Sequence, residues 1–376
     1  MYPLVSVVMP TYNRAALLPK AIDSVLGQTY SDIELIVVND GSTDDTEEAL
    51  EPYQDKITYI KKSNGGCGDA KNAGLNVARG KYITHLDDDD VMMPTRIERL
   101  VDFFTDNPSS KGWQGDCPDV GLCATSASLI DENDKVIGIK HLRTVPPKTR
   151  LLHLLLGLVA VQSNIMVPKE VFQRVGEYSN VICEDYDIWL RIARRYEIGV
   201  IEEPLVKYRK HPNQITGRKN NKPLMASLQR INLLFLQTVP MGEIIPHLQL
   251  PALGHALIGA LLCRHKLFDV AEQEIRRAPK DGAAQLWLAM LSLYQRDFDQ
   301  ARTCFQQVPK GHPCSKEIPQ AFSLIDKTEQ LCAQKTAKDN NSEAVIQLRS
   351  ELQLFMLRLF NETLRLATGG KICLKD

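Results

Sequence analysis

The sequence lacks paired cysteines and an excess of either charge. Nine cysteines are scattered along 376 residues, and no Cys-x-x-Cys occurs among them. This pattern argues against a disulfide framework and a cysteine zinc site, and it predicts free thiols in a reducing compartment. Lysine and arginine number 45 against 46 aspartates and glutamates, so the whole chain has no charge drive toward nucleic acid or anionic lipid. We therefore expect no nucleic-acid partner.

Long apolar runs are missing as well. The longest, Leu151–Val161 and Leu253–Cys263, are too short to cross a bilayer, which takes about 20 residues. Met1 leads into the apolar stretch Leu4–Met9 without a basic region or a small-residue cleavage site, so we expect no secretory leader. These absences predict a cytoplasmic protein, and they leave open a peripheral contact with the inner face of the membrane.

The first hundred residues alternate short β-branched runs with stretches of helical period. The runs predict buried strands at Leu4–Met9, Ile33–Val38, Ile57–Ile60 and Tyr82–Leu86. The stretches between them predict helices around Leu18–Val25, at Thr43–Leu50 and at Asp69–Ala78. Strands that alternate with helices are typical of the Rossmann-like α/β class, a mainly parallel sheet with helices on both faces. Ligands of such sheets bind at the carboxyl ends of the strands.

A polar, turn-rich segment, Gly217–Pro223, predicts a domain boundary. Because 376 residues exceed one typical domain, we expect an α/β domain over residues 1–218 and an all-α domain over residues 219–376. No convincing strand follows this boundary.

Two similar segments recur in the second domain. Phe, Asp, Ala and Pro recur at an interval of 30 residues in the segments that begin at Leu267 and Asp297. Each segment predicts a helix hairpin closed by a proline, and it resembles a tetratricopeptide-type repeat, whose usual period is slightly longer. Lys335–Ser342 predicts a loop before a final amphipathic helix, Glu343–Ala367. We expect these helices to serve self-association or a protein partner rather than chemistry.

Four polar segments follow the predicted strands. They are Pro10–Arg14, Asn39–Asp44, Asn64–Asn72 and Leu86–Asp90. Because the carboxyl ends of parallel strands meet at one edge of a sheet, we expect all four segments to converge there. Their convergence indicates a ligand site more strongly than any single motif does.

The last of these segments contains four consecutive aspartates, Asp87–Asp90. Adjacent carboxylates repel one another, so such a cluster at a strand end is unfavourable unless a cation neutralises it. Hard oxygen ligands suit Mg²⁺ or Mn²⁺, which commonly share their coordination with substrate phosphates. A solvated acidic turn that opens a helix is the alternative, and the buried strand directly before the run favours the metal.

The second and third segments indicate nucleoside binding. The Asp40 carboxylate can accept a hydrogen bond from the N–H of a uracil ring, and Gly41 lets the backbone approach a base or ribose closely. A tight turn with Ser42 or Asp44 capping the next helix is the alternative, and the two are compatible. Gly66 belongs to a glycine-rich loop that can admit a ligand, and Lys71 on the following helix either faces the base or diphosphate or is exposed.

These motifs resemble the family 2 glycosyltransferases of the GT-A fold over roughly residues 4–211. They read VSVVMPTYNR, SVLGQTYSDIELIVVNDGSTDD, GCGDAKNAGLNVARGKYITHLDDDD and VGEYSNVICEDYDIWLRIARR, in the family's order. The resemblance implies an Asp-x-Asp pair at Asp87 and Asp89, with Asp89 as the direct ligand of Mn²⁺ or Mg²⁺. The implied nucleotide-sugar-binding residues are Pro10, Thr11, Tyr12, Asn13, Arg14, Asp40, Gly66, Lys71, Asp87 and Asp88. Lys71 stands where the family often has arginine, which binds as a planar fork.

The predicted catalytic base lies near the end of the first domain. Glu184 and Asp185 open a predicted helix, and a carboxylate at a helix N-terminus is stabilised in the ionised form that a base needs. The resemblance assigns the base to Asp185 and places Glu184 and Trp189 at the acceptor or just behind the site. A plain helix start and a core tryptophan are the alternatives. By the same resemblance His211 reaches the metal or the diphosphate, although a lone histidine usually does neither.

The resemblance therefore implies an inverting, metal-dependent glycosyltransferase. The expected donor is a UDP-sugar, and the expected acceptor is a hydroxyl of a glycan, a lipid-linked molecule or a protein, in cell-surface or extracellular glycan synthesis. Two other classes stay open. A sugar-phosphate nucleotidyltransferase normally opens with a Gly-rich, basic phosphate loop, and Pro10–Arg14 is not such a loop. A non-catalytic scaffold built on the helical repeats is disfavoured by the intact Asp40, Asp87, Asp89 and Asp185.

Overall fold

The computed structural model describes residues 2–106, 120–143, 149–156, 165–212, 214, 222–245, 249, 251–278, 282–333 and 343–370. The chain forms two compact units, Met1–Ile231 and Asn232–Asp376. The expected domain boundary between residues 218 and 219 and the expected loop Lys335–Ser342 lie outside the described residues. The division after Ile231 falls within helix α9 (Lys222–Thr238), so the boundary predicted from the sequence stays a prediction.

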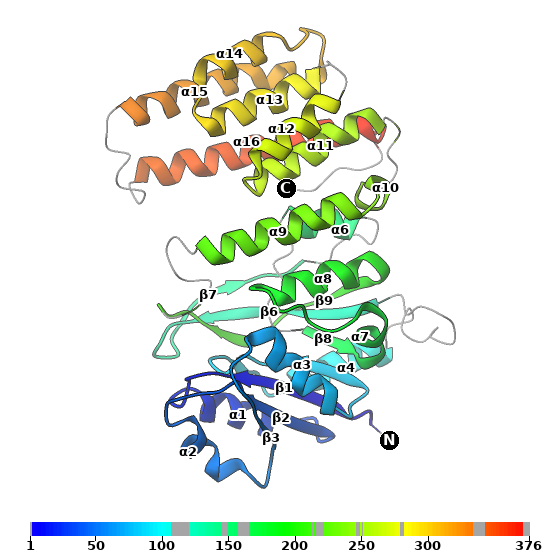
Figure 1. The fold of residues 1–376 in the computed structure, drawn as a ribbon, viewed down its shortest axis with the longest axis vertical. Helices are drawn as coiled ribbons and strands as arrows, with labels where there is room; N and C mark the ends of the chain where they lie inside the picture. The colour runs from blue at the N-terminus through cyan, green and yellow to red at the C-terminus, as the bar shows by residue number, and fades with distance from the viewer. Residues whose placement is uncertain are drawn as a thin grey trace. The chain divides into compact units, whose positions relative to one another are not determined.

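The first four strands form the parallel half of one sheet (Figure 1). β1 (Val5–Thr11), β2 (Ile33–Asn39), β3 (Thr58–Lys61) and β4 (Tyr82–His85) lie in the order β3-β2-β1-β4. The segments that connect them are α1 (Leu18–Leu26), α2 (Thr46–Leu50), the 3-10 turn η1 (Glu51–Tyr53) and α3 (Cys67–Val77). The predicted alternation of strands and helices is confirmed, with element ends shifted by a few residues.

The other half of the sheet is mixed. Its strands are β5 (Val91–Met92), β6 (Val120–Ile130), β7 (Val136–Lys140), β8 (Ile165–Pro168) and β9 (Glu197–Arg209). β6 and β9 pair in parallel, whereas β8 is antiparallel to β4 and β6, β5 to β9, and β7 to β6. The described helices of this half are α4 (Arg96–Asp106), α6 (Arg150–Leu155), α7 (Lys169–Val175) and α8 (Glu184–Arg195). The sheet is therefore rich in parallel pairs without being mainly parallel throughout.

Helices cover both faces of the parallel half. Val5, Val7 and Met9 of β1 pack with α1 and α4 in one core. On the opposite face a Cβ atom added to Gly74 of α3 would lie 2.4 Å from Cγ1 of Val8, so α3 packs tightly on β1. Because side chains alternate along a strand, α1 and α3 lie on opposite faces of the sheet. Burial on both faces explains why β1 has apolar residues on both of its faces, with Ser6 the exception before residues 7–10, instead of alternating polar and apolar residues.

The second unit is helical throughout its described residues. Its helices are α10 (Met241–Ile244), α11 (Pro251–Arg264), α12 (Phe268–Arg277), α13 (Gly282–Gln295), α14 (Phe298–Gln306), α15 (Ile318–Ala333) and α16 (Glu343–Ala367), with a 3-10 turn η3 (Pro313–Glu317). The hairpins α11–α12 and α13–α14 confirm the two predicted helix pairs, and α16 has the predicted bounds. The tetratricopeptide resemblance itself stays a prediction.

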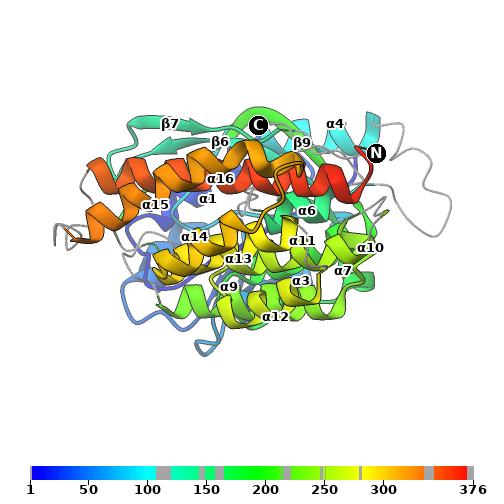
Figure 2. The same ribbon diagram turned by 90° about the horizontal axis from the view of Figure 1, so that it is seen from above.

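The final helix packs within this helical unit. α16 contacts α11, α13 and α15, and its course can be followed in Figure 2. Phe355, Leu359 and Leu364 of α16 are each 0% exposed, so the helix is part of the hydrophobic core of the unit. No described helix combines the length and the apolar character that crossing a bilayer requires.

Candidate active site

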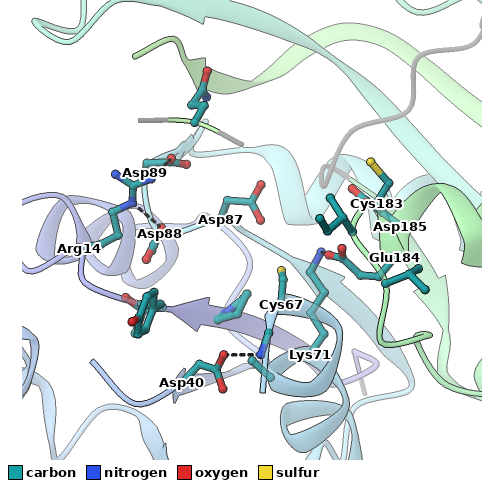
Figure 3. A pocket seen from close by; sticks show the side chains of 18 of the residues that line it. Arg14, Asp40, Cys67, Lys71, Asp87, Asp88, Asp89, Cys183, Glu184 and Asp185 are labelled. Atoms are coloured by element: carbon teal, nitrogen blue, oxygen red, sulfur yellow. Dashed lines mark hydrogen bonds and ion pairs between the residues drawn. The ribbon is translucent and has the colours of Figure 1, made fainter. Parts of the chain in front are cut away.

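A cavity of about 970 Å³ lies at the carboxyl edge of the parallel strands (Figure 3). The segments that follow β1, β2, β3 and β4 all contribute to its wall, as their predicted convergence requires. Every residue that the sequence assigned to the site lines this cavity except His211, which contacts Asp89. Lining residues that the motifs did not single out include Lys140, Ile182, Cys183, Tyr186, Tyr208 and Gln214.

The acidic loop, defined as Asp87–Asp90, joins β4 to β5. One carboxylate oxygen from each of Asp87, Asp89 and Asp90 lies within 4.8 Å of the others. Burial, with the nearby charge of Asp89, raises the pKa of Asp88 to about 8. Burial and the charges of Asp87 and Asp89 likewise raise the pKa of Asp90, which is 0% exposed. Burial and mutual repulsion therefore disfavour the charged forms of these two carboxyls, an effect that a bound cation would offset.

The residues of this loop fit a divalent cation. The Asp90 carboxylate accepts a hydrogen bond from the main-chain N–H of Arg209 through Oδ1, while its buried Oδ2 has no hydrogen-bond partner in the described part of the chain. Clustered carboxylate oxygens are the ligands that Mg²⁺ and Mn²⁺ prefer. The predicted ligand Asp89 belongs to the cluster, and Asp90 joins it although the sequence did not single it out. The Nε2 atom of His211 lies 2.8 Å from the Oδ2 atom of Asp89.

The segment that follows β1 places a positive charge near the acidic loop. Arg14 lies 4.0 Å from Asp88 and 3.9 Å from Asp89, so it partly neutralises the loop. Asn13, at a φ of 54°, accepts a hydrogen bond from the Thr43 N–H at 2.7 Å and donates its own N–H to Ser42. Asn13 therefore ties the segment after β1 to the segment after β2.

Asp40 shapes the glycine-rich loop. Its carboxylate accepts hydrogen bonds from the main-chain N–H groups of Gly65 and Gly66, at 2.9 and 2.8 Å, and from Nζ of Lys62 at 2.7 Å. Gly41 has a φ of +76°, and a Cβ atom there would lie 2.7 Å from the Asn64 nitrogen. Glycine is therefore required for the close approach of these two segments.

Lys71 is buried, so the alternative of an exposed lysine is wrong. Its Nζ donates to Glu184 Oε1 at 2.7 Å, and the two side chains are 3% and 8% exposed. Burial alone would lower the pKa of Lys71, but the neighbouring carboxylates raise it above its usual value. Burial likewise opposes the charge of Glu184, and Lys71 holds the pKa of that carboxyl below its usual value. The pair is therefore ionised.

Asp185 follows Glu184 in the first turn of α8. Burial raises its pKa to about 6, against the opposing effect of Lys71 and with contributions from Glu184 and Asp87. Cys183 enters the helix in the left-handed conformation, at a φ of 68°. Trp189, one turn further along, is 5% exposed, and its indole N–H has no hydrogen-bond partner in the described part of the chain. Figure 3 shows Asp185 and the acidic loop on different sides of the cavity.

Comparison with known proteins gives consistent findings. A family model described as Glycosyl transferase family 2 matches residues 6–143. An uncharacterized glycosyltransferase of Rickettsia prowazekii is 36% identical over 230 residues, which cover 58% of this chain and 68% of that protein. Another, from Rickettsia felis, is 36% identical over 229 residues, but this match covers only 36% of that protein. Among solved structures, residues 1–349 of S. aureus TarS in complex with UDP-GlcNAc share the fold at a TM-score of 0.52 and 15% identity, over 88% of this chain and 92% of that one.

Proposed function

Because the chain belongs to the family 2 glycosyltransferases, we propose that it transfers a sugar from a UDP-sugar to an acceptor hydroxyl with inversion at the anomeric carbon. The proposed acceptor is a glycan, a lipid-linked molecule or a protein, in cell-surface or extracellular glycan synthesis. The observation that carries the proposal is that Asp185 and the acidic loop line one cavity from different sides. A base and a diphosphate site on different sides of a bound sugar are what a direct displacement requires.

Asp185 is the proposed base. With a pKa of about 6 it is mostly ionised at neutral pH, yet it is basic enough to accept a proton from a hydroxyl as that hydroxyl attacks. The acceptor oxygen forms a bond to the anomeric carbon as the bond to the diphosphate oxygen breaks. The proton moves to Asp185, and the pair of electrons leaves with the nucleoside diphosphate.

The acidic loop and Arg14 form the proposed diphosphate side. A Mn²⁺ or Mg²⁺ ion bound by Asp89 and its neighbours would supply positive charge to the departing diphosphate. Arg14, whose side chain is 24% exposed, lies close enough to the loop to reach the same phosphates. Its guanidinium suits bidentate binding of phosphate oxygens.

The nucleoside side is proposed around Thr11, Tyr12 and Asp40. The Asp40 carboxylate already accepts three hydrogen bonds from its own chain, so it leaves only part of its acceptor capacity for a base. The uracil assignment therefore rests chiefly on the family resemblance. TarS, with a similar fold, was solved with UDP-GlcNAc, which makes UDP-sugars the first donors to test.

A donor panel tests this proposal. UDP- and GDP-sugars are titrated into the protein by calorimetry, with and without Mn²⁺. We expect a UDP-sugar to bind, and Mn²⁺ to tighten that binding. Binding of GDP-sugars alone would contradict the UDP assignment, and tight binding unaffected by Mn²⁺ would contradict the metal site.

Asp89→Ala gives the residue-level form of the same test. Because removing one of several crowded carboxylates relieves repulsion, the fold should survive while Mn²⁺-dependent donor binding is lost. Asp102→Ala is the matched control, because Asp102 is exposed on α4 and does not line the cavity. Unchanged donor affinity of Asp89→Ala in both conditions would show that this aspartate is not the ligand.

A further inference from the structure

Arg209 lies between the acidic loop and a turn of the sheet. It is the last residue of β9 and is 2% exposed. β9 pairs on one side with β5, which directly follows the acidic loop, and on the other with β6, where Arg209 is the register partner of Ile130. The β6–β7 turn, defined as residues 131–135, begins one residue beyond Ile130. Arg209 therefore lies at the end of β9, next to both the acidic loop and the β6–β7 turn; the order of β5, β9 and β6 can be followed through the register partners Val91, Lys207 and Ser128.

Toward the acidic loop, Arg209 makes two hydrogen bonds of different kinds. Its main-chain N–H donates to Oδ1 of Asp90 at 2.9 Å, and its Nε donates to the main-chain oxygen of Asp89 at 2.8 Å. It therefore holds the side chain of one aspartate and the backbone of the other. Two residues further along, His211 contacts the Asp89 carboxylate itself at 2.8 Å.

Toward the turn, the rest of the guanidinium is anchored. Nη1 donates to the main-chain oxygens of Asp131 and Glu132, at 3.1 and 3.4 Å, and Nη2 donates to Oδ1 of Asp134 at 2.7 Å. Asp134 also pairs with Lys20 of α1. The turn is itself ordered, since Oδ1 of Asp131 accepts the N–H groups of residues 133 and 135 at 2.9 and 3.0 Å. The three guanidinium nitrogens all have partners, so Arg209 has little capacity left for a substrate.

We propose that Arg209 is a positioning residue that fixes the acidic loop against the β6–β7 turn, so that the carboxylates keep the spacing a divalent cation needs. This inference rests on the proposed function, because it presumes a cation at the loop. It adds a role for Arg209, Asp134 and Lys20, none of which lines the cavity. Residues behind metal ligands commonly change metal affinity by roughly 10–100-fold when they are replaced.

The experiment measures Mn²⁺ binding directly, by the loss of the free-ion signal in electron paramagnetic resonance, without donor or acceptor. Arg209→Lys keeps the charge, but one ammonium cannot reach Asp89, Asp131 and Asp134 together. Asp134→Ala removes one anchor at a side chain that is 35% exposed, so it should fold even if Arg209→Lys does not. Arg99→Lys is the matched control, because Arg99 binds Glu203 of the same strand by two hydrogen bonds, with both side chains about half exposed.

We expect Arg209→Lys to weaken Mn²⁺ binding by roughly tenfold or more, and Asp134→Ala to weaken it less, while Arg99→Lys binds like the wild type. The far-ultraviolet circular dichroism of soluble variants should match that of the wild type. Wild-type affinity in Arg209→Lys, or in Asp134→Ala if the first variant does not fold, would overturn the inference and leave the proposed function standing. A wild-type protein that binds no Mn²⁺ would overturn the proposed metal site, and the inference with it.

Discussion

Glu184 and the acidic loop, which both line the cavity, have different charge partners. Glu184 is matched by the buried ammonium of Lys71 at 2.7 Å. The acidic loop has Arg14 at 3.9–4.0 Å and hydrogen bonds from Arg209. Burial and the charge of Asp89 nevertheless raise the pKa of Asp88 to about 8. Glu184 is therefore neutralised within the protein, and the acidic loop is left for a cation to complete. Asp185 lies beside Glu184.

Asp185→Asn separates binding from chemistry at this residue. The amide keeps the shape of the side chain but cannot take a proton, so UDP affinity should hold while transfer falls by about a hundredfold or more. Titration with UDP by calorimetry measures the affinity, and the release of UDP from the donor measures transfer. Asp187→Asn is the control, since Asp187 lies in the same helical turn but does not line the cavity. Near-normal transfer in Asp185→Asn would move the base to another residue, with Glu184 the first to test.

The pH dependence of transfer follows from the same group. The Asp185 carboxyl has a raised pKa of about 6, so the active, deprotonated base is present above that pH and is lost as pH falls through it. Because a cation beside Asp87 would remove one charge that raises this pKa, the midpoint should lie at or below about pH 6. A kcat profile from pH 4.5 to 8.5 measures it. A midpoint well above pH 7 would contradict the assignment.

Lys71→Met tests the buried ion pair. The substitution leaves the Glu184 carboxylate buried without its partner, which costs about 3–5 kcal/mol when a buried pair is broken from one side. We therefore expect a lower thermal midpoint for Lys71→Met in calorimetry. The double variant Lys71→Met/Glu184→Gln removes both charges and should recover much of the loss. A single variant as stable as the wild type would mean that Glu184 finds water or another cation.

At the scale of elements, the site depends on how closely helices and loops approach the parallel strands. α3 carries Lys71 near its middle and Gly74 three residues later, and Gly74 lies directly against Val8 of β1. The distance between α3 and the sheet therefore sets how far Lys71 reaches toward α8. On the other side of the cavity, β9 holds the acidic loop through Arg209.

Gly74→Ala tests the approach of α3. Alanine normally stabilises a helix relative to glycine, but here the new Cβ would lie 2.4 Å from Cγ1 of Val8 and 3.3 Å from Cγ2 of Val38. Overpacking of this kind costs about 1–3 kcal/mol, so we expect a lower thermal midpoint. Gly242→Ala in α10 is the control, since no atom lies within 4 Å of its added Cβ. A raised midpoint in Gly74→Ala would mean that the helix shifts without cost.

At the scale of the whole molecule, the cavity and the helical core belong to different units. The cavity and every residue that the proposed reaction uses belong to the unit Met1–Ile231. Within the unit Asn232–Asp376, α16 closes the helical core: Trp287 of α13 donates to Thr363 of α16 at 3.3 Å and packs edge-on against Phe360. The final helix is therefore part of the core of the helical unit.

Deletion of residues 343–376 tests this division. Removing α16 would expose the faces of α11, α13 and α15 that it covers, so we expect aggregation or a changed assembly state in light scattering. Donor binding should persist in any soluble fraction, because the cavity belongs to the other unit. A truncated protein with the solubility and particle size of the full chain would show that α16 is dispensable.

Local patterns were enough to predict the first four strands, several helices and the four polar segments of the site, but not β5 to β9. β-branched runs and helical spacing predicted β1 to β4 and the bounds of α16, because these signals lie within a few residues of one another. The helix hairpins were predicted from the 30-residue repeat. Parallel strands bring their carboxyl ends to one edge, so the four polar segments were expected to meet there. The family resemblance added the roles of Asp89 and Asp185, which the residues alone left open between chemistry and helix capping.

Only the tertiary structure decided which charged groups pair. Lys71 and Glu184 are 113 residues apart in the chain, and Arg209 lies 120 residues from Asp89. Neither pair shares a helix face or a turn, so no periodicity connects its members. Each contact depends instead on strand register and on the close approach of α3 to the sheet. The sequence by itself determined the first four strands, the helices around them and the polar segments. The partners of Lys71 and Arg209 follow from packing, because charge pairing across a fold is decided by distance in space.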